Sequence, residues 1–477
     1  MAIRLNSHLD LDNLSCAQWA VLEDLQGNIL KGHGRDHATH NFLHFATPDA
    51  GKEYLRWLRG LITSAADQVR ASQRLRPSSE EGGAGGLSTI SGQLFVSVAL
   101  SRKGYEGLGI NPDLIPQDPA FQEGMAARGP FLMDPAAASW SMVNGGREIH
   151  ALVVIACDTA EITDAYSILL MSRLPDGVHK LASETGRIIR NAQNQPIEHF
   201  GYVDGTSSPV FMLQDIEGKG NSWKPSLSPL SLVLDRCPGG DANSFGSYLV
   251  FRKLEQNPRM FAEMELELGK ALGMSHDEAG ALVVGRKKDG TSVMVAPSTS
   301  SSSPTNDFDY SADRYGTTCP LHAHARKVNP RGGTLPDDLR KGVEWERPHW
   351  IVRRGMPYGT RRDDPAKPAL PDDRPGWGKV GLLFMCYQSS IKTQFELLQG
   401  KWANDSSFPG EQSGFKGVDP LIGARATSQR REGKVLQQAP LYRSRSGQPV
   451  SFQVRPCVRL QGGEYFFVPS ISLFRKL

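Results

Sequence analysis

The sequence contains few cysteines for its length, six in 477 residues. They are Cys16, Cys157, Cys237, Cys319, Cys386 and Cys457. No two of them have the C-x-x-C spacing of zinc or redox sites. Cys157 and Cys386 lie inside apolar runs, which is typical of buried thiols. This usage excludes a disulfide-stapled secreted scaffold and indicates a reducing compartment.

The sequence also lacks a long apolar run. No stretch is long and apolar enough to span a bilayer. The first residues are soon followed by Asp10, Asp12, Glu23 and Asp24, so the uninterrupted apolar segment of a signal peptide is missing. From these absences we expect a cytoplasmic protein with no membrane partner.

A strong charge of either sign is missing as well. Lys and Arg number 54 against 51 Asp and Glu, which leaves a formal charge of +3. This balance gives no reason to expect nucleic acid as a partner. Hydrophobic residues make up 39% and charged residues 22% of the chain, which is ordinary for a globular protein. The length suggests two or three domains, although one large domain is also compatible with it.

Two common catalytic loops are absent from the sequence. It contains neither a phosphate-cradling Gly-Lys-Ser/Thr loop nor a Gly-x-Ser-x-Gly nucleophile turn. Residues 376–381 match Gly-x-Gly-x-x-Gly by letter, but they lead into an apolar strand and not into a helix. We therefore interpret this match as a turn and not as a dinucleotide site.

The elements that are present indicate an α+β fold. Strands are expected at residues 41–46, 93–99, 148–157, 247–251, 380–387 and 464–468. Helices are expected at residues 51–68, 159–173 and 257–272, after Ser275, and from Ser389 to about Trp402. The order of elements in the first half is the ferredoxin-like pattern, and the second half repeats it in style. We therefore expect two ferredoxin-like modules with antiparallel sheets, in domains 1–212 and 213–477.

The first motif with chemical content is Gly201-Tyr202-Val203-Asp204-Gly205. Two glycines around a lone aspartate indicate a tight turn that fixes the carboxylate. Taken alone, such an Asp-Gly pair is more often only a turn.

The second motif runs from Cys319 to Arg331 and contains His322 and His324. Histidines at i and i+2 suit a metal or a haem iron. On a strand they would face the same side, and on a helix they would not. An ordinary pair of surface or core histidines is the alternative.

The third motif runs from Ile351 to Gly359, with apolar residues leading into Arg353 and Arg354. An arginine at the end of a strand beside a cavity suits an anionic ligand. The alternative is an ordinary arginine in a surface salt bridge.

The order of the three motifs resembles the dye-decolorising peroxidase family, in particular its larger bacterial and fungal branch. The order is the Asp-Gly turn, then His-Ala-Arg-Lys-Val-Asn-Pro-Arg, then Arg-Arg-Gly-Met-Pro-Tyr-Gly. The resemblance spans almost the whole chain. Further matching segments are Asp24–Leu30, Gly381–Gln388, Trp402–Asn404 and Gly463–Phe467.

The resemblance implies one haem b per chain, held in the C-terminal module. His324 matches the proximal iron ligand of the family, and His322 is the rival. The second ring nitrogen of the ligand would donate to a carboxylate, which gives the ring imidazolate character. By position in the family pattern, Glu396 is the candidate acceptor and Asp405 the alternative.

The resemblance also implies a distal site. Asp204 matches the distal acid, which would shuttle a proton between the oxygens of peroxide. Arg353 matches the distal arginine, with Arg354 as the competing assignment. Leu382 and Phe384 are expected to line the distal pocket. Arg326 and Arg331 are expected to contact the haem propionates.

The implied activity is reduction of hydrogen peroxide with one-electron oxidation of dyes, phenolics or similar aromatic donors. A carboxylate titrates at about pH 4 and a histidine at about 6.5, so an aspartate in the distal motif predicts an acidic optimum. Bulky donors would need a surface relay, and the residues that flank the arginine motif are the candidates. They are Trp345, Trp350, Tyr358 and Trp377. An oligomer is compatible with the sequence.

Two other functions remain as alternatives. A haem carrier or sensor without turnover would need His324 but not the pair of Asp204 and Arg353, so the pair favours an enzyme. A chlorite-converting or haem-degrading relative on a similar fold would lack the Asp-Gly motif.

Overall fold

The structure is a computed structural model that describes residues 3–74, 94–142, 148–216, 230–295, 306–335, 337–361, 374–409, 416–423 and 440–477. Its main feature is a ten-stranded sheet in which eight antiparallel strands close into a ring. Around the ring the strands are β8 (Phe245–Gln256), β14 (Val458–Val468), β2 (Phe95–Ser101), β3 (Ala151–Cys157), β1 (His37–Phe45), β4 (Val178–Arg187), β10 (Met356–Tyr358) and β11 (Val380–Gln388). The ring closes because β11 also pairs with β8. Two short strands lie outside it, β7 (Asp235–Arg236) on β8 and β9 (Val352–Arg353) on β11.

The ring consists of two modules with the same strand order. In the first module the spatial order is β4–β1–β3–β2, which is fourth, first, third and second along the chain. In the second module the order β14–β8–β11–β10 is again fourth, first, third and second. This order, with helices between the strands, is the ferredoxin-like arrangement. The predicted class of two ferredoxin-like modules with antiparallel sheets is confirmed.

The two modules join edge to edge. Strand β2 of the first module pairs with β14 of the second through Phe466 opposite Ser101 and Phe467 opposite Leu100. Strand β4 pairs with β10 through Tyr358 opposite Gly186. Between the modules, the described parts of the segment 188–244 (residues 188–216 and 230–244) hold only short elements, and the predicted boundary at residue 212 lies in this segment.

Alternation along the strands divides the apolar side chains between two buried clusters. One cluster takes Phe42 of β1, Val154 of β3 and Phe251 of β8, and it fills the interior of the ring. Their neighbours Leu43 and Val153 belong to a second cluster on the outer face. Because strand side chains alternate between the faces, each strand supports both clusters.

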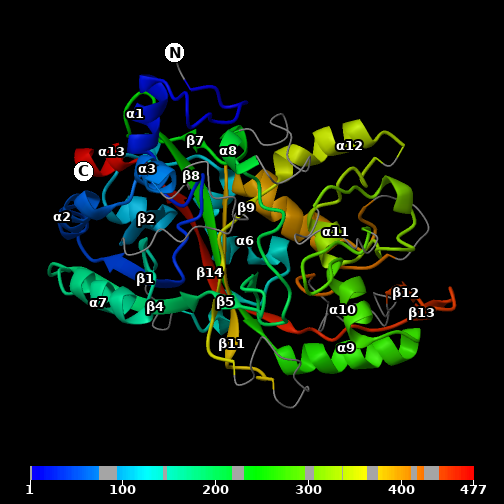
Figure 1. Cartoon of the computed structure of the whole chain (residues 1–477). Coiled ribbons are helices and arrows are strands. Elements are labelled where there is room, and N and C mark those ends of the chain that lie inside the picture. The colour runs from blue at the N-terminus through cyan, green and yellow to red at the C-terminus, as the bar shows by residue number, and fades with distance from the viewer. Residues whose placement is uncertain are drawn as a thin grey trace.

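The helices cover the outside of the ring. The α-helices are α1 (Cys16–Asp24), α2 (Pro48–Leu58), α3 (Ala65–Arg74), α4 (Arg102–Gly107), α5 (Pro119–Glu123), α6 (Met125–Leu132), α7 (Ala160–Met171), α8 (Leu213–Ile216), α9 (Pro258–Leu272), α10 (His276–Val284), α11 (His324–Val328), α12 (Leu339–Glu346) and α13 (Ile471–Lys476). In Figure 1, α2 and α7 lie to the left of β8 and β14, and α9 to α12 lie to their right. None of the helices in the described ranges is long and apolar enough to cross a membrane.

Shorter turns and small sheets complete the fold. The 3-10 helices are η1 (Arg59–Leu61), η2 (Pro112–Leu114), η3 (Ala137–Ser139), η6 (Leu230–Leu232), η7 (Ser311–Asp313) and η8 (Arg347–His349). The π-helices are η10 (Ile391–Phe395) and η11 (Leu398–Ala403). The small sheets pair β5 (Ile189–Arg190) with β6 (Pro196–Ile197), and β12 (Leu441–Arg443) with β13 (Pro449–Ser451).

Most of the predicted elements are present, and one is divided. The predicted helix 51–68 is interrupted after α2, and α3 begins at Ala65. The reason is local, because the Ser64 side chain accepts from the Asp67 N–H and the Asp67 carboxylate accepts from the Ser64 N–H. This reciprocal pair starts a new helix. The predicted caps at Thr159 and Ser275 are confirmed.

Candidate functional site

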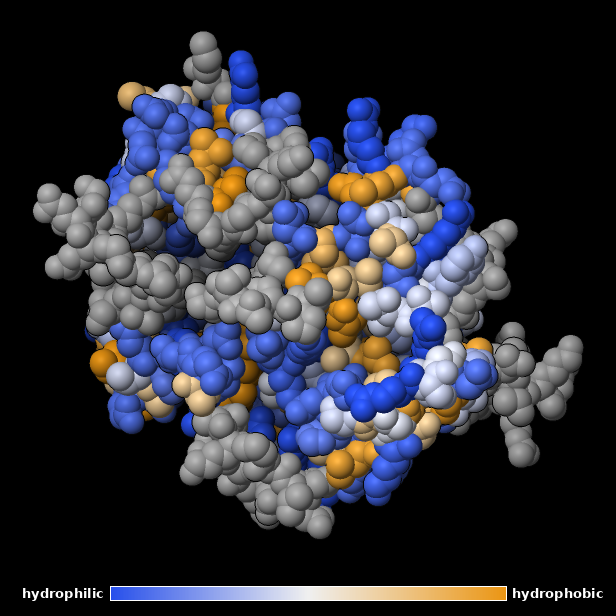
Figure 2. Space-filling view, turned by 45° about the vertical axis from the view of Figure 1, so that its right-hand side comes forward, coloured by the Kyte–Doolittle hydropathy of each residue, from blue (hydrophilic) through white to orange (hydrophobic). Residues whose placement is uncertain are grey.

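A cavity of about 1090 Å³ lies against the outer face of the second module. Its floor is made by Leu382 and Phe384 of β11 and by Leu254 of β8. The register places Leu382 opposite Leu254, and Leu254 opposite Leu460 of β14, so one row of side chains crosses three strands. The predicted lining by Leu382 and Phe384 therefore agrees with the structure. Figure 2 shows hydrophobic side chains gathered in the right-hand half of the molecule, bordered by hydrophilic ones.

His324 lies at the first position of α11 and lines the cavity. Its Nδ1 is 2.8 Å from Oδ2 of Asp419, a buried residue whose other carboxylate oxygen accepts the N–H groups of Leu421 and Ile422. Burial alone would lower the pKa of His324, but the negative charge of Asp419 and its hydrogen bond to the ring together raise the pKa above its ordinary value. Because Nδ1 is engaged, Nε2 is the ring nitrogen left for a ligand in the cavity.

The predicted carboxylate partner of His324 is wrong. Glu396 accepts hydrogen bonds from Arg128 at 2.9 and 2.7 Å and from the Tyr465 hydroxyl at 3.1 Å. The alternative, Asp405, accepts from Ser407 through its side chain. Asp419 takes the role because its N–H donates to the Ala403 carbonyl at the end of η11, which brings the loop beside α11. Asp419 lies in a loop without periodicity or motif, so the sequence held no signal for it.

His322 does not line the cavity. It is buried, and its ring packs edge-on against Tyr442 with 4.7 Å between ring centroids. The turn before α11 separates the two histidines, so they do not share a face. The geometry therefore assigns the cavity-facing role to His324.

Asp204 and Arg353 form an ion pair inside the cavity. Arg353 Nη1 donates to Asp204 Oδ1 at 2.7 Å. The two side chains keep 35% and 34% of their surface exposed, and His324 keeps 28%, as expected for groups that face open space. Burial raises the pKa of Asp204, but the charge of Arg353 and the Gly205 N–H together bring it below its ordinary value.

The backbone explains why these two side chains meet. Gly201 and Gly205 adopt positive φ values of 95° and 82°, so the motif forms the tight turn that its glycines predict. Arg353 lies on β9, and its register partner is Cys386 of β11, two residues beyond Phe384. Arg353 therefore stands at the edge of the cavity floor.

Arg354, the competing assignment, is directed away from the cavity. Its guanidinium group donates to the carbonyl oxygens of Asn28, Ile29 and Arg353. Burial lowers its pKa to about 10. Arg354 thus connects the N-terminal segment to the strand that carries Arg353.

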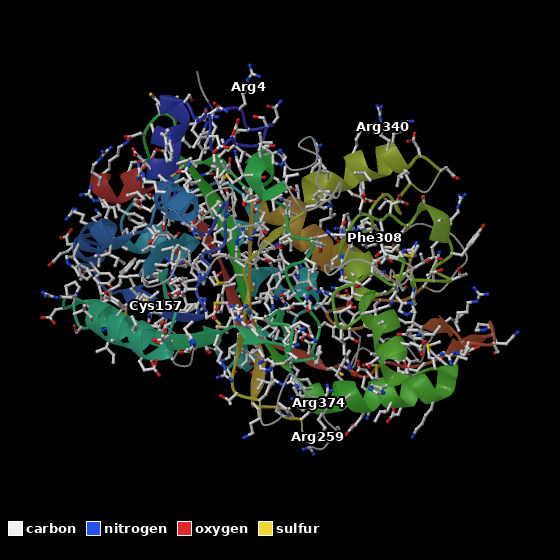
Figure 3. The ribbon with its side chains drawn as sticks, viewed as in Figure 1. Arg4, Cys157, Arg259, Phe308, Arg340 and Arg374 are labelled. Atoms are coloured by element: carbon white, nitrogen blue, oxygen red, sulfur yellow. The ribbon has the colours of Figure 1, made fainter. Side chains whose placement is uncertain are left out.

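Two arginines form a cationic wall of the cavity. Arg331, as predicted, lines it, and Arg286 lies beside it. Both arginines donate to Oδ1 of Asn306 at 2.7 Å. Both guanidinium groups also lie over the Phe308 ring, with the guanidinium carbon 4.1 Å from the ring centroid for Arg331 and 5.5 Å for Arg286. Phe308 is labelled in Figure 3, in the right-hand half of the molecule near α11. Burial and the neighbouring Arg286 lower the pKa of Arg331 to about 10, so an anionic group placed here would relieve an unfavourable charge.

The predicted role of Arg326 is wrong. Arg326 is buried and does not line the cavity. Its Nη1 is 2.9 Å from Asp313 Oδ2 and 2.6 Å from the Cys319 carbonyl oxygen. Arg286, which lies where a second cation was expected, follows the helix-ending Gly285 and belongs to no motif, so the sequence did not reveal it.

The predicted relay residues occupy different surroundings. Trp350 lines the cavity, whereas Trp345 is exposed. The ring centroid of Trp345 lies 6.0 Å from that of the buried Trp402. Trp377 is stacked under Arg459 at 3.8 Å. Tyr358 lies under the Lys253 ammonium group at 5.1 Å. These contacts favour no single one of the candidates.

The donor set in the cavity fits haem. A flat macrocycle needs an apolar floor, which Leu382, Phe384 and Leu254 supply. An axial ligand needs a neutral imidazole nitrogen oriented by a carboxylate, as in His324 with Asp419. The two carboxylate substituents of haem need cations, which Arg286 and Arg331 provide. Within the described residues, the hydrogen bonds of these two arginines go to neutral oxygens, so their positive charges are left for the carboxylates. The volume of about 1090 Å³ lies slightly above the roughly 300–1,000 Å³ range of cofactor sites, as a large macrocycle requires.

Comparisons with known proteins agree with this geometry. Residues 24–190 match the family described as "DyP dimeric alpha+beta barrel domain", and residues 195–409 match "Dyp-type peroxidase, C-terminal". The chain is 36% identical to the multifunctional dye peroxidase DyP2 of Amycolatopsis sp. over 100% of both chains. It is 31% identical to the dye-decolorizing peroxidase msp1 of Mycetinis scorodonius over 80% of this chain and 75% of that protein.

Solved structures are similar over the same length. The structure of DyP2 from Amycolatopsis superposes with a TM-score of 0.87 and 35% identity over 100% of both chains. A DyP-type peroxidase from Anabaena superposes with a TM-score of 0.85 and 36% identity, covering 99% of this chain and 98% of that one. Two matching family regions, full-length relatives above 30% identity and one shared fold establish that this chain belongs to the dye-decolorising peroxidase family, whose members are haem-dependent peroxidases.

Proposed function

We propose that the chain binds one haem b in the cavity between α11 and the outer face of the second module. His324 would bind the iron through Nε2, with Asp419 holding Nδ1. Arg286 and Arg331 would hold the propionates, since each carries a positive charge against neutral partners. This assignment replaces the pair of Arg326 and Arg331 expected from the sequence.

We propose further that the protein reduces hydrogen peroxide at this site. When bound, haem supplies the iron at which peroxide is reduced and through which electrons arrive from a donor. Asp204 would take the proton from one peroxide oxygen and return it to the other. Arg353 would stabilise the peroxide anion by its fixed positive charge. The observation that carries the proposal is the ion pair of Asp204 and Arg353 in the cavity that His324 also lines.

The electron donors would be dyes, phenolics or similar aromatic compounds, taken in one-electron steps. The printed names of the relatives, which call them dye and dye-decolorizing peroxidases, support this class. An acidic optimum is part of the proposal, because the distal acid is an aspartate whose pKa lies below its ordinary value. The relay for bulky donors would be one of Trp345, Trp350, Tyr358 and Trp377.

The proposal includes a reducing compartment such as the cytoplasm. All six cysteines are free thiols, and five of them are buried. Free buried thiols are the usage of a chain that is never exposed to disulfide-forming conditions. Fractionation of the source cells, with the peroxidase followed by antibody, checks the location.

The decisive experiment compares wild type with His324→Ala after haem is added. Wild type is expected to show the absorption spectrum of a histidine-bound haem, which changes on adding peroxide and returns on adding a dye. His324→Ala is expected to lose that spectrum. Rapid bleaching of the haem to an open-chain product would indicate a haem-degrading protein instead. No change on adding peroxide would indicate a carrier.

A further inference from the structure

The position of Asp204 is set by a hairpin formed by residues 196–204. Ile197 and Val203 make an antiparallel bridge across it. The Asp204 N–H donates to the Pro196 carbonyl oxygen at 3.1 Å. Any shift of the hairpin therefore moves the Asp204 carboxylate relative to Arg353.

One residue, Glu198, makes the hydrogen bonds that shape this hairpin. Its backbone N–H donates to the Tyr202 carbonyl oxygen at 3.1 Å, and its carbonyl accepts the Gly201 N–H at 2.9 Å. Its carboxylate folds back over the turn and accepts the N–H groups of Phe200 at 2.8 Å and Tyr202 at 3.0 Å. The side chain thus satisfies two buried backbone donors that the turn itself leaves without a partner.

The same carboxylate fastens the hairpin to the cavity floor. Gln256, near the end of β8, donates from Nε2 to Glu198 Oε2 at 2.6 Å. Both side chains line the cavity. The strand that supports the floor and the turn that carries Asp204 therefore meet at Glu198.

The charge states of the two carboxylates leave position as the link between them. Burial raises the pKa of Glu198, the N–H donors of Phe200, Tyr202 and Gln256 lower it, and the negative charge of Asp204 raises it again. Because the pKa of Asp204 is lowered, Glu198 is already neutral where Asp204 titrates, so Glu198 acts on Asp204 by holding the turn. The other ionisable groups around the two carboxylates are Arg353 and His324 beside Asp204, and Tyr202, Glu265 and Lys288 behind the hairpin.

We propose that Glu198 is a positioning residue for the peroxide reaction, which fixes the Asp204 turn against β8 and so holds the Asp204 carboxylate on Arg353. The inference rests on the proposed function, in which Asp204 carries the proton. Glu198 itself transfers no proton in this role.

The test uses Glu198→Gln in the haem-loaded protein, with two readouts. The rate constant for the reaction with peroxide is expected to fall about 10- to 100-fold, the loss that a small misplacement of a catalytic group produces. Infrared difference titration, with the Asp204 band assigned from Asp204→Asn, is expected to show that Asp204 protonates at higher pH, because a displaced turn loosens its ion pair with Arg353. The acid limb of the rate profile should shift in the same direction.

Two further variants test whether the position of the turn is responsible. Gln256→Met removes the tether to β8, so we expect a slower reaction and an acid limb shifted in the same direction as in Glu198→Gln. Glu265→Gln is the matched control, because Glu265 is a buried carboxylate that contacts the same hairpin through the Tyr202 hydroxyl at 2.9 Å. We expect it to leave the titration of Asp204 unchanged.

The outcomes decide the inference. An unchanged rate and an unshifted Asp204 titration in Glu198→Gln overturn it, and so does an equal shift in Glu265→Gln. If Glu198→Gln fails to fold, the rate constant of Gln256→Met for the reaction with peroxide decides the inference. A wild-type rate constant in that variant rejects the positioning role of Glu198. Failure of the proposed function is seen separately, as a wild-type peroxide rate in Asp204→Asn, whereas the infrared shift in Glu198→Gln does not depend on that rate.

Discussion

Nδ1 of His324 lies 2.8 Å from Oδ2 of Asp419, a residue 95 positions farther along the chain. The carboxylate is fully buried and has no competing cation among its hydrogen-bond donors in the described ranges. The carboxylate therefore acts directly on the imidazole ring, fixing its orientation and raising its basicity as a ligand.

From this pair we predict that Asp419→Asn raises the reduction potential of the bound iron. The carboxylate favours the more oxidised metal, and removal of such a partner changes metal affinity by roughly 10- to 100-fold. If that change applies to one oxidation state, it corresponds to about 60–120 mV. Spectroelectrochemical titration measures it. Glu396→Gln is the control, because Glu396 is bonded to Arg128 and Tyr465. A larger shift in the control than in Asp419→Asn would reject the assignment.

The two histidines of the motif are predicted to differ sharply when haem is added. His324→Ala should lose the histidine-bound spectrum, whereas His322→Gln should retain it, because His322 packs on Tyr442 outside the cavity. The His322 variant is expected to be less stable, since a buried side chain loses its fitted contact. Titration of both variants with haem, followed by absorption, distinguishes the two. A normal spectrum in His324→Ala would contradict the assignment.

The rate of reaction with peroxide is predicted to persist to low pH. Burial raises the pKa of Asp204, but Arg353 and the Gly205 N–H together lower it by more, so the folded value lies below the ordinary one of about 3.9. The ionised form, which accepts the proton, is thus present above that pKa and is lost only as the pH falls through it. In Arg353→Gln the lowering by Arg353 is removed, and the acid limb should move to higher pH. Stopped-flow measurement of the peroxide rate across pH gives the acid limb of wild type and of Arg353→Gln. An acid limb at the same pH in both proteins would refute the coupling.

Loss of the distal acid is predicted to slow the peroxide step without removing the cofactor. Asp204→Asn keeps the shape of the turn but cannot accept a proton, and such a group contributes roughly 10²- to 10⁴-fold. The haem spectrum at rest should resemble that of wild type, because His324 and Asp419 are untouched. Single-turnover kinetics with excess peroxide provide the measurement, and a fall of less than about 10-fold would argue against Asp204 as the proton carrier.

Substitution of the two arginines of the second motif is predicted to affect different properties, haem binding at Arg331 and stability at Arg326. Arg331→Gln should weaken haem binding about 10- to 100-fold, which corresponds to loss of a charge-assisted hydrogen bond of about 1.5–3 kcal/mol. Arg326→Met should leave haem affinity unchanged and destabilise the fold by about 3–5 kcal/mol, because it strands the buried Asp313. Haem titration measures the affinity for haem, and urea unfolding measures the free energy of unfolding. The opposite pattern would restore Arg326 as the propionate contact.

The contrast between the correct and incorrect predictions has a physical basis. His324, Asp204 and Arg353 each lie in a local motif whose turn or helix start positions the side chain, so their roles are carried by neighbouring residues. Strands β1 and β11 were found for the same reason, because the alternation in residues 41–46 and the dense apolar run in residues 380–387 are local patterns. Strand β4, by contrast, has a mixed burial pattern and was not predicted.

The incorrect predictions concern partners set by tertiary contacts. Asp419 reaches His324 through a loop without a pattern, and Arg286 reaches the cavity from the end of α10. Glu396 and Arg326 have the expected residue types near the expected positions, but their buried partners, Arg128 and Asp313, come from distant segments. A choice among several carboxylates or several arginines depends on where the chain returns, and a single sequence does not contain that information.

The place of β14 in the ring has a consequence for how the protein is made. This strand, residues 458–468, lies between β8 and β2, and it contributes Val458 and Leu460 to the cavity wall. A nascent chain therefore cannot close the ring or complete the cavity until β14, which follows the other seven strands of the ring in the sequence, has been synthesised. Until then the first module has the edge of β2 unpaired.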